Sequence, residues 1–233
     1  MIGSDRYLTG LPFLRGLAPA DMARAGRAFL LRRRVRGEII FREGDAADSV
    51  YLLRSGLVKA VKLSLKDDPV TLEIIAPGHL FGMMPALDGR PYPVDAVCLQ
   101  DSDIYRIRTT DFAELMRRHP PFSQAVYSEV GDHLRRSQVL RALIKESAER
   151  RIGYILWMLS QSLGPELRLS RGELAEIAGT TGETAIRVLG RLRAAGLIGA
   201  RRRRVTILRP DDLRAGTGIV RIPKTILRAR PRA

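Results

Sequence analysis

The stretch "ELAEIAGTTGETAIRVLGRL", residues 173–192, contains two amphipathic helical patterns separated by only a few small residues. The S-x-x-E pattern of a capping box, at 170–173, starts the first helix. Gly179 supplies a left-handed residue that ends this helix, and Thr180 or Thr181 caps the second one. Two short helices joined by a tight turn indicate a helix-turn-helix, whose second helix enters the major groove of DNA. An ordinary packed pair of helices is the alternative.

The second helix has one apolar face and one polar face. Its inward positions recur at i, i+3, i+4 and i+7, and they are Ala185, Val188, Leu189 and Leu192. The residues expected to lie against DNA are the cap and the outward positions: Thr181, Gly182, Glu183, Thr184, Ile186, Arg187 and Arg191. The segment "GLIGARRRRVTIL" that follows predicts a turn, a strand, a basic turn and a second strand. This is the pattern of a wing, from which Arg201, Arg202, Arg203 and Arg204 would reach phosphates.

The charge of the chain is concentrated in its C-terminal part. The formal net charge is +15, and residues 1–147 hold 22 basic and 18 acidic residues. Residues 148–233 hold 18 basic and 7 acidic residues, a net of +11. A segment with this excess favours a polyanionic partner, and together with the helix pair and wing it favours nucleic acid over a merely solvated basic surface.

Several classes of protein are disfavoured by what the sequence lacks. The single cysteine, Cys98, excludes an intramolecular disulfide, and no cysteine cluster suits zinc or an iron–sulfur centre. The N-terminus does not resemble a signal peptide, and no apolar run is long enough to span a bilayer. Motifs of common enzymes, such as G-x-S-x-G, a Walker loop and C-x-x-C, are also missing. We therefore expect a cytoplasmic protein that is not an enzyme.

The N-terminal part reads as many short antiparallel strands. After short helical material at 11–36 that ends in a basic run, apolar segments with partial alternation lie within 37–45, 48–64, 69–82 and 94–107. Such segments, bounded by glycine, aspartate and proline, predict a β-barrel of the jelly-roll type. Glycines stand where turns need a positive φ, at Gly37, Gly44, Gly56, Gly78 and Gly82.

A long helix is expected from about Phe122 to Ser147, between the two parts of different composition. A dimer seam along it is predicted from spacings that alternate between four and three. The seam residues are Val126, Val130, His133, Ser137, Leu140 and Ile144, with Leu134 on the same stripe. A helix packed on its own barrel would show the same spacing, so that alternative stays open.

The chain resembles the cyclic-AMP receptor protein/FNR superfamily of bacterial transcription regulators over roughly residues 11–213. "GEIIFREGDAADSVYLLRSGLVKAV" matches the family pattern G-x-x-I-x-x-E-G-D…Y-x-L-x-x-G-x-V, and "PGHLFG" matches its G-x-x-F-G turn. "GETAIRVL" resembles the R-E-T-V-x-R-x-L of the DNA-reading helix. The resemblance implies that Glu183 and Arg187 read bases. Gly182 stands at an arginine of cAMP-type members, and Ile186 replaces a small residue and could pack on a thymine methyl.

The resemblance also implies a degenerate cAMP site. A cAMP pocket needs a glutamate after F-G for the ribose and Arg-Ser-Ala for the cyclic phosphate. Met83 stands at the glutamate, and we expect Val94 and Asp95 at the arginine and serine. Arg90 in the preceding loop is the remaining candidate cation, and Ser137 matches a serine that touches nucleotide across the dimer in cAMP-type members. Binding of cAMP is therefore not expected.

Three interpretations of the effector region remain. The segment could fill its own barrel, bind an apolar effector, or hold haem with His79, His133 or a methionine as axial ligand. The candidate pocket residues are Met83, Met84, Tyr92, Val94, Asp95, His133 and Ser137, with Pro85, Leu87 and Pro93 beside them. A cupin-type metal enzyme is a further, unrelated hypothesis, but His79, His119 and His133 lack the H-x-H spacing it needs, so no metal site is predicted.

These inferences divide the chain into four segments. We expect an effector-type β-barrel domain at 1–120, a dimerisation helix at 121–147, a winged helix-turn-helix domain at 148–213 and a basic tail at 214–233. The fold class is α+β. The expected partners are a second copy of the chain, a pseudo-palindromic DNA operator and, as a further candidate, RNA polymerase, with no membrane.

Overall fold

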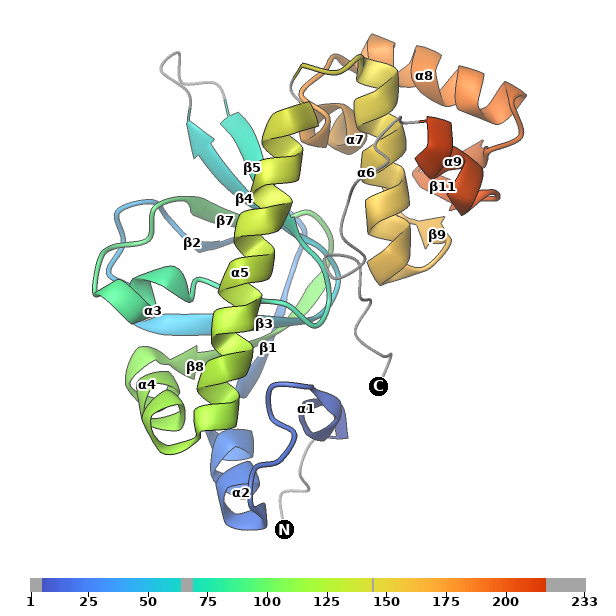
Figure 1. Cartoon of the computed structure of the whole chain (residues 1–233). Helices are drawn as coiled ribbons and strands as arrows, with labels where there is room; N and C mark the ends of the chain where they lie inside the picture. Colours follow the sequence, from blue (N-terminus) through green and yellow to red (C-terminus); the bar gives the residue numbers. More distant parts are fainter. Residues whose placement is uncertain (1–5, 64–68, 144, 217–233) are drawn as a thin grey trace. The chain divides into compact units, whose positions relative to one another are not determined.

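The computed structural model describes residues 6–63, 69–143 and 145–216 of the chain (Figure 1). Within these ranges the side chains at 136, 140 and 141 are not described. The described residues form two compact units, of which the first holds the chain up to Lys62 together with Glu73–Leu134. The second holds the chain from Arg135 onward with the described residues of 63–72.

Two four-stranded sheets form the jelly roll of the N-terminal part, in the orders β1-β8-β3-β6 and β2-β7-β4-β5. They are two packed sheets rather than the closed barrel that the sequence suggested, because the strands hydrogen-bond in two separate sets. The strands are β1 (Leu30–Arg34), β2 (Ile39–Phe41), β3 (Ser49–Ser55), β4 (Val58–Leu63), β5 (Pro69–Ile75), β6 (Leu80–Phe81), β7 (Asp95–Cys98) and β8 (Ser102–Arg108).

The turns between these strands depend on glycine where it was expected. Gly37, Gly44, Gly56, Gly78 and Gly82 all have φ between +66° and +93°, so this prediction is confirmed. At Gly56 a Cβ atom would lie 2.3 Å from Ser102 Oγ, so a side chain is excluded by space as well as by backbone conformation. The basic run at 30–34, expected to end helical material, is instead the strand β1, which pairs with β8.

Helices flank the jelly roll, and the longest of them runs along it instead of lying at one end (Figure 1). They are α1 (Arg6–Gly10), α2 (Pro19–Ala28), α3 (Met84–Asp88), α4 (Thr109–Arg118) and α5 (Pro120–Leu143). Buried residues of α1, α2, α4 and α5 pack with residues of β3, β6 and β8 in one apolar cluster, in which Leu8, Phe112 and Phe122 are almost fully enclosed. The long helix α5 begins at Pro120, which suits the first turn of a helix, and it ends at Leu143 rather than at Ser147.

The second unit contains the C-terminal helices and a small sheet. Its elements are α6 (Ala148–Leu163), β9 (Glu166–Leu167), α7 (Arg171–Ile177), α8 (Gly182–Ala194), β10 (Ile198–Arg201), β11 (Arg204–Ile207) and α9 (Pro210–Gly216). The small sheet has the order β10-β11-β9. No helix in the described part of the chain is both long enough and apolar enough to cross a membrane.

Candidate nucleic-acid interface

The helix pair α7 and α8 begins at the side chains that the sequence indicated. The Ser170 hydroxyl accepts from the backbone N–H of Glu173 at 3.1 Å, and the Glu173 carboxylate accepts from the N–H of Ser170 at 2.6 Å. This is the complete capping box. Gly179 follows α7 with φ +56°, and Thr181 caps α8 by accepting from the N–H of Thr184 at 3.2 Å. The capping of both helices is therefore confirmed, with Thr181 rather than Thr180 at the second cap.

Helix α8 presents one face to its own unit and the other to solvent. The predicted inward residues Ala185, Val188, Leu189 and Leu192 are all buried. Glu183, Ile186 and Arg187 are exposed on the opposite side, and Ile186 keeps 47% of its surface accessible. Because charged and apolar side chains stand together on a convex helical face, this surface suits the edges of base pairs in a major groove.

A two-stranded wing follows α8, made of β10, β11 and the turn between them. The strands pair with Arg201 opposite Arg204, which leaves Arg202 and Arg203 in the turn. Residues 201–204 are all exposed, and Arg203 takes the left-handed φ of 55°. A left-handed arginine costs about 1 kcal/mol relative to glycine. The turn thus carries a further guanidinium at a position whose backbone conformation glycine would adopt without this cost.

Some arginines of this unit contact acidic groups instead of standing free on the outer face. Arg191, expected on the DNA side of α8, lies 2.9 Å from Glu149 of α6. Arg204 of the wing lies 3.5 Å from Glu166 of β9. The sequence pattern did not indicate either contact, since each partner lies on another element. Arg187 differs, because its Nη2 atom donates to the hydroxyl of Thr184 on the same helix at 3.2 Å.

Four aromatic rings, those of Phe41, Tyr51, Phe81 and Tyr92, lie together in the buried core between the sheets of the jelly roll and form the aromatic cluster. All four are buried, with exposures between 2% and 7%. The rings of Phe41 and Tyr92 stack with centroids 3.8 Å apart, and those of Tyr51 and Phe81 stack at 5.3 Å. Each ring buries about 150–250 Å² of surface, so the cluster supplies much of the core between the sheets.

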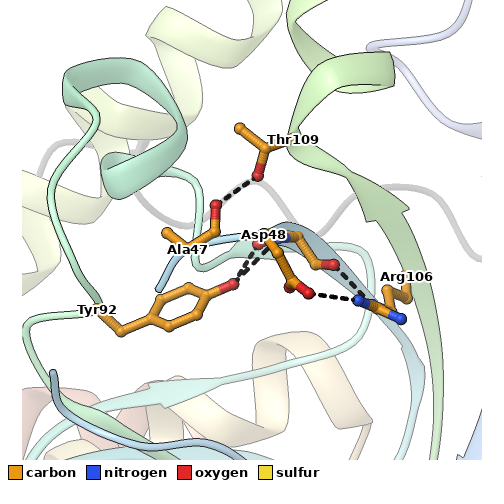
Figure 2. Close-up of polar contacts among 6 residues, drawn as sticks. Ala47, Asp48, Tyr92, Arg106 and Thr109 are labelled. Atoms are coloured by element: carbon orange, nitrogen blue, oxygen red, sulfur yellow. Dashed lines mark hydrogen bonds and ion pairs between the residues drawn. The ribbon is translucent and has the colours of Figure 1, made fainter. Parts of the chain in front are cut away.

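Tyr92 forms hydrogen bonds to the segment at 45–49 through both its backbone and its side chain. Its hydroxyl donates to the carbonyl of Ser49 at 2.5 Å, while its own N–H donates to the carbonyl of Asp45 at 3.0 Å. Figure 2 shows this hydroxyl pointing at the backbone beside Asp48. Arg106 holds the same segment from β8, donating to Asp48 at 2.8 Å. Burial raises the pKa of the Tyr92 phenol far above its ordinary value, so the ring stays neutral.

Comparison with known proteins assigns both parts of the chain. A family model described as "Cyclic nucleotide-binding domain" matches residues 31–119, and one described as "Crp-like helix-turn-helix domain" matches residues 149–215. The protein named "Cyclic AMP receptor protein" of Thermus thermophilus is 34% identical over 193 residues, covering 82% of this chain and 89% of the relative. The chain belongs to the cyclic-AMP receptor protein/FNR superfamily of bacterial transcription regulators.

Solved structures agree with this assignment. A transcriptional regulator of the CRP family from Thermus thermophilus matches with a TM-score of 0.66 and 26% identity, covering 80% of this chain and 96% of that one. FixK2 from Bradyrhizobium japonicum matches with a TM-score of 0.72 over 80% of this chain and 96% of that one, and at 19% identity it supports the fold alone. The chain is therefore a DNA-binding transcription regulator and not an enzyme.

The residues of the predicted pocket of this CRP/FNR-type regulator lie in different surroundings. Met84 is 43% exposed and Leu87 is 39% exposed, because α3 turns positions i and i+3 outward together. Met83 is buried, but in the cluster beneath the helices rather than among the aromatic rings. Of the candidate set, Tyr92 belongs to the aromatic cluster and Val94 packs against the same core.

The structure also shows what the charged candidate residues of the pocket contact. Arg90 is 83% exposed and lies 3.9 Å from Asp88, so its guanidinium faces solvent. The Asp95 carboxylate accepts from the backbone N–H of Glu43 at 2.6 Å. Phe41, which stacks on Tyr92, was not singled out from the sequence. The apolar run within 37–45 predicts a strand that contains Phe41, but it does not show which aromatic ring Phe41 stacks on.

The histidines of this regulator each lie beside a carboxylate of another element. His79 Nδ1 is 2.7 Å from Glu129, a residue of α5 that is only 1% exposed. His133 Nδ1 on α5 is 2.8 Å from Glu73 of β5. Among the described residues no group of three or more histidine, cysteine, aspartate or glutamate side chains could hold a metal ion. The haem hypothesis stays untested.

The predicted dimer seam needs one correction. Val126 is fully buried against its own unit, and Val130 packs partly on the same cluster, so the alternative of a helix packed on its own sheets holds there. Tyr127 and Leu134 of α5 are 62% and 58% exposed; Leu134 was already on the predicted stripe, whereas Tyr127 was not. Ser137 is half-buried, while the side chain of Leu140 and all of Ile144 lie outside the described residues.

Proposed function

We propose that this regulator binds a pseudo-palindromic DNA operator as a homodimer, with α8 of each copy in a major groove. The observation that carries the proposal is the division of α8 into a fully buried apolar face and an exposed face bearing Glu183 and Arg187. An arginine pairs best with the O6 and N7 atoms of guanine, and a glutamate accepts from the amino group of cytosine. Ile186 beside them favours contact with a thymine methyl.

The wing supplies the part of the binding that does not depend on sequence. Residues 201–204 are four exposed arginines at the tip of a hairpin beside α8. Guanidinium groups neutralise phosphates and release counterions, so they add affinity for any duplex. Base reading by α8 and phosphate binding by the wing are therefore separable contributions.

Dimerisation is proposed along the exposed face of α5. Tyr127 and Leu134 are one heptad apart, so they lie on one side of the helix, and both are large apolar residues in solvent. A second copy of α5 would cover both. A twofold dimer places two α8 helices one turn of DNA apart, which is why a pseudo-palindromic operator is expected. RNA polymerase is a further candidate partner.

We further propose that the jelly roll works without cAMP. The aromatic cluster occupies its interior, and the candidate cation Arg90 faces solvent. The name of the Thermus thermophilus relative describes a cAMP receptor. In this chain Met83 is apolar where the ribose needs a carboxylate, and Asp95 is acidic where the cyclic phosphate needs a polar or basic side chain. A role of the domain as a ligand-free scaffold accounts best for these residues.

The test is selection of binding sites from a pool of random duplexes, followed by fluorescence anisotropy on the selected site. We expect two inverted half-sites whose centres are about 34–36 Å apart. The affinity should fall with salt, and replacing Arg201 and Arg202 with glutamine should lower the log–log slope by about 2. Recovery of random sequences, or of a single unrepeated half-site, would contradict the proposal.

A further inference from the structure

The turn between α7 and α8 carries carbonyl groups that the helices themselves cannot satisfy. A helix leaves its last C=O groups without partners in the helix. Ala178 is the C-cap of α7, and Gly179 follows it in a left-handed conformation. Both carbonyls accept hydrogen bonds from one side chain: Arg151 Nε donates to Ala178 O at 2.8 Å, and Arg151 Nη2 donates to Gly179 O at 3.1 Å.

The same guanidinium makes a third contact with a different part of the chain. Arg151 Nη1 donates to the carbonyl of Glu146 at 2.9 Å. Glu146 lies in the short linker between the end of α5 at Leu143 and the start of α6 at Ala148. One planar group in the first turn of α6 thus holds the linker and the turn together. The ammonium of a lysine is a single point of charge and lacks the fork that spans three carbonyls.

The position of this turn determines where α8 begins. Thr181, the N-cap of α8, comes two residues after Gly179, and the N–H of the intervening Thr180 donates to Ala175 O at 2.9 Å. A shift of the turn backbone would therefore change the direction in which α8 leaves it. We infer that Arg151 is a positioning residue for sequence-specific DNA binding, which fixes the α7–α8 turn and ties it to the α5–α6 linker. This inference rests on the proposed reading of bases by α8.

A second arginine provides a matched control. Arg209 binds the carbonyls at the other end of α8: its Nε atom donates to Gly196 O at 3.2 Å, and Nη2 donates to Ala195 O. Arg209 therefore closes a helix end as Arg151 does, but it does so at the end of α8 that lies away from the α7–α8 turn. Replacing either arginine with lysine keeps the net charge and removes the fork.

The experiment compares Arg151→Lys and Arg209→Lys with the wild type in anisotropy titrations on the selected site and on random duplex. Circular dichroism melts set a temperature at which all three proteins are folded. For Arg151→Lys we expect the affinity for the selected site to fall about tenfold, because charge-assisted hydrogen bonds are lost. The affinity for random duplex should stay within about twofold, and Arg209→Lys should keep the wild-type preference.

Hydrogen exchange provides a readout that does not depend on DNA. In Arg151→Lys, peptides covering the linker at 143–150 and the turn at 178–182 should both exchange faster, since one side chain holds both. Equal exchange in the variant and the wild type would overturn the inference. So would an equal loss of affinity for both duplexes with a smaller salt slope, which would make Arg151 a phosphate contact. If the wild type itself shows no preference for a site, the proposed function fails instead.

Discussion

Single side chains in α8 hold one another in place before any DNA is bound. The Thr181 hydroxyl, which caps the helix, donates to the Thr184 hydroxyl at 3.0 Å, and that hydroxyl accepts from Arg187 at 3.2 Å. A guanidinium held on one side keeps its remaining donors in a fixed plane. The cap of α8 therefore also helps to orient the residue proposed to read guanine.

The first prediction concerns Arg187 itself. Replacing Arg187 with alanine should cost about 1–3 kcal/mol of binding free energy at the selected site and relax the preference at one base pair. Random duplex should be bound almost as before, because the wing arginines are untouched. Anisotropy titrations on both duplexes measure this difference. An equal loss on selected and random DNA would show that Arg187 contacts phosphate and not a base.

Cys98 provides a prediction about pH and reactivity. Burial raises the pKa of its thiol to about 11. At pH 8 only about one molecule in 1,000 then carries the reactive thiolate. Iodoacetamide should label native protein far more slowly than protein unfolded in urea. Equal labelling rates in the two states would show that the thiol is exposed, and would support a role in oxidation sensing.

The same shift has a defined effect on stability. In the unfolded chain the thiol has the ordinary pKa of about 9, so it loses its proton at a lower pH than the folded thiol does. The free energy of unfolding should therefore fall as the pH rises from about 9 to about 11, and the contribution of Cys98 should be constant below that range. Urea denaturation at a series of pH values measures this fall. Replacing Cys98 with alanine should remove this part of the pH dependence.

Helix α5 shows how far an element can be predicted from the chain. Its existence and its start beside the prolines follow from periodicity and from the fixed φ of proline. The surface on which α5 packs does not follow from the sequence. The stripe through Val126 and Val130 has the same spacing whether it packs on a second helix or on its own sheets. The strand β1 was missed for a related reason: a run of arginines on an exposed edge lacks the alternation that marks a half-buried strand.

The positions of the caps and glycines could be predicted, whereas contacts with backbone carbonyls could not. Ser170, Glu173 and Gly179 act locally, so sequence spacing suffices to place them. Arg151 binds carbonyls of residues 27 and 28 positions away, and a carbonyl carries no residue identity that a pattern could reveal. The stacking of Phe41 on Tyr92 is hidden in the same way, since it depends on how two sheets meet.

A pair of substitutions on α5 tests its two faces. Replacing the exposed Leu134 with aspartate should give folded monomers with weakened operator binding, because it places a charge in the proposed dimer face. Replacing the buried Val126 with aspartate should instead reduce the free energy of unfolding by about 4 kcal/mol or more. Sedimentation velocity and urea denaturation separate the two effects. A Leu134→Asp protein that remains dimeric would exclude this face as the interface.

At the scale of the whole molecule, a DNA-binding unit is joined to a jelly roll whose interior is occupied by its own side chains. Family membership establishes what the C-terminal unit does, but it does not transfer a ligand to the jelly roll. The residues that decide the ligand are few, and several of them differ in chemistry from what a cyclic nucleotide needs. We therefore expect DNA binding by this protein to be independent of cyclic nucleotides.

The last prediction follows from charge and space. A bound cyclic phosphate carries one negative charge, which needs a paired cation or several hydrogen bonds once it leaves water. Arg90 is 83% exposed, and Asp95, expected at the phosphate position from the resemblance, would add a second negative charge. Losing the partner of a charged group costs several kcal/mol, and each 1.4 kcal/mol is tenfold in affinity. Titration calorimetry with cAMP and cGMP should therefore show no binding at micromolar concentrations. Micromolar binding, abolished by Arg90→Ala, would mean that Arg90 turns inward to meet the phosphate.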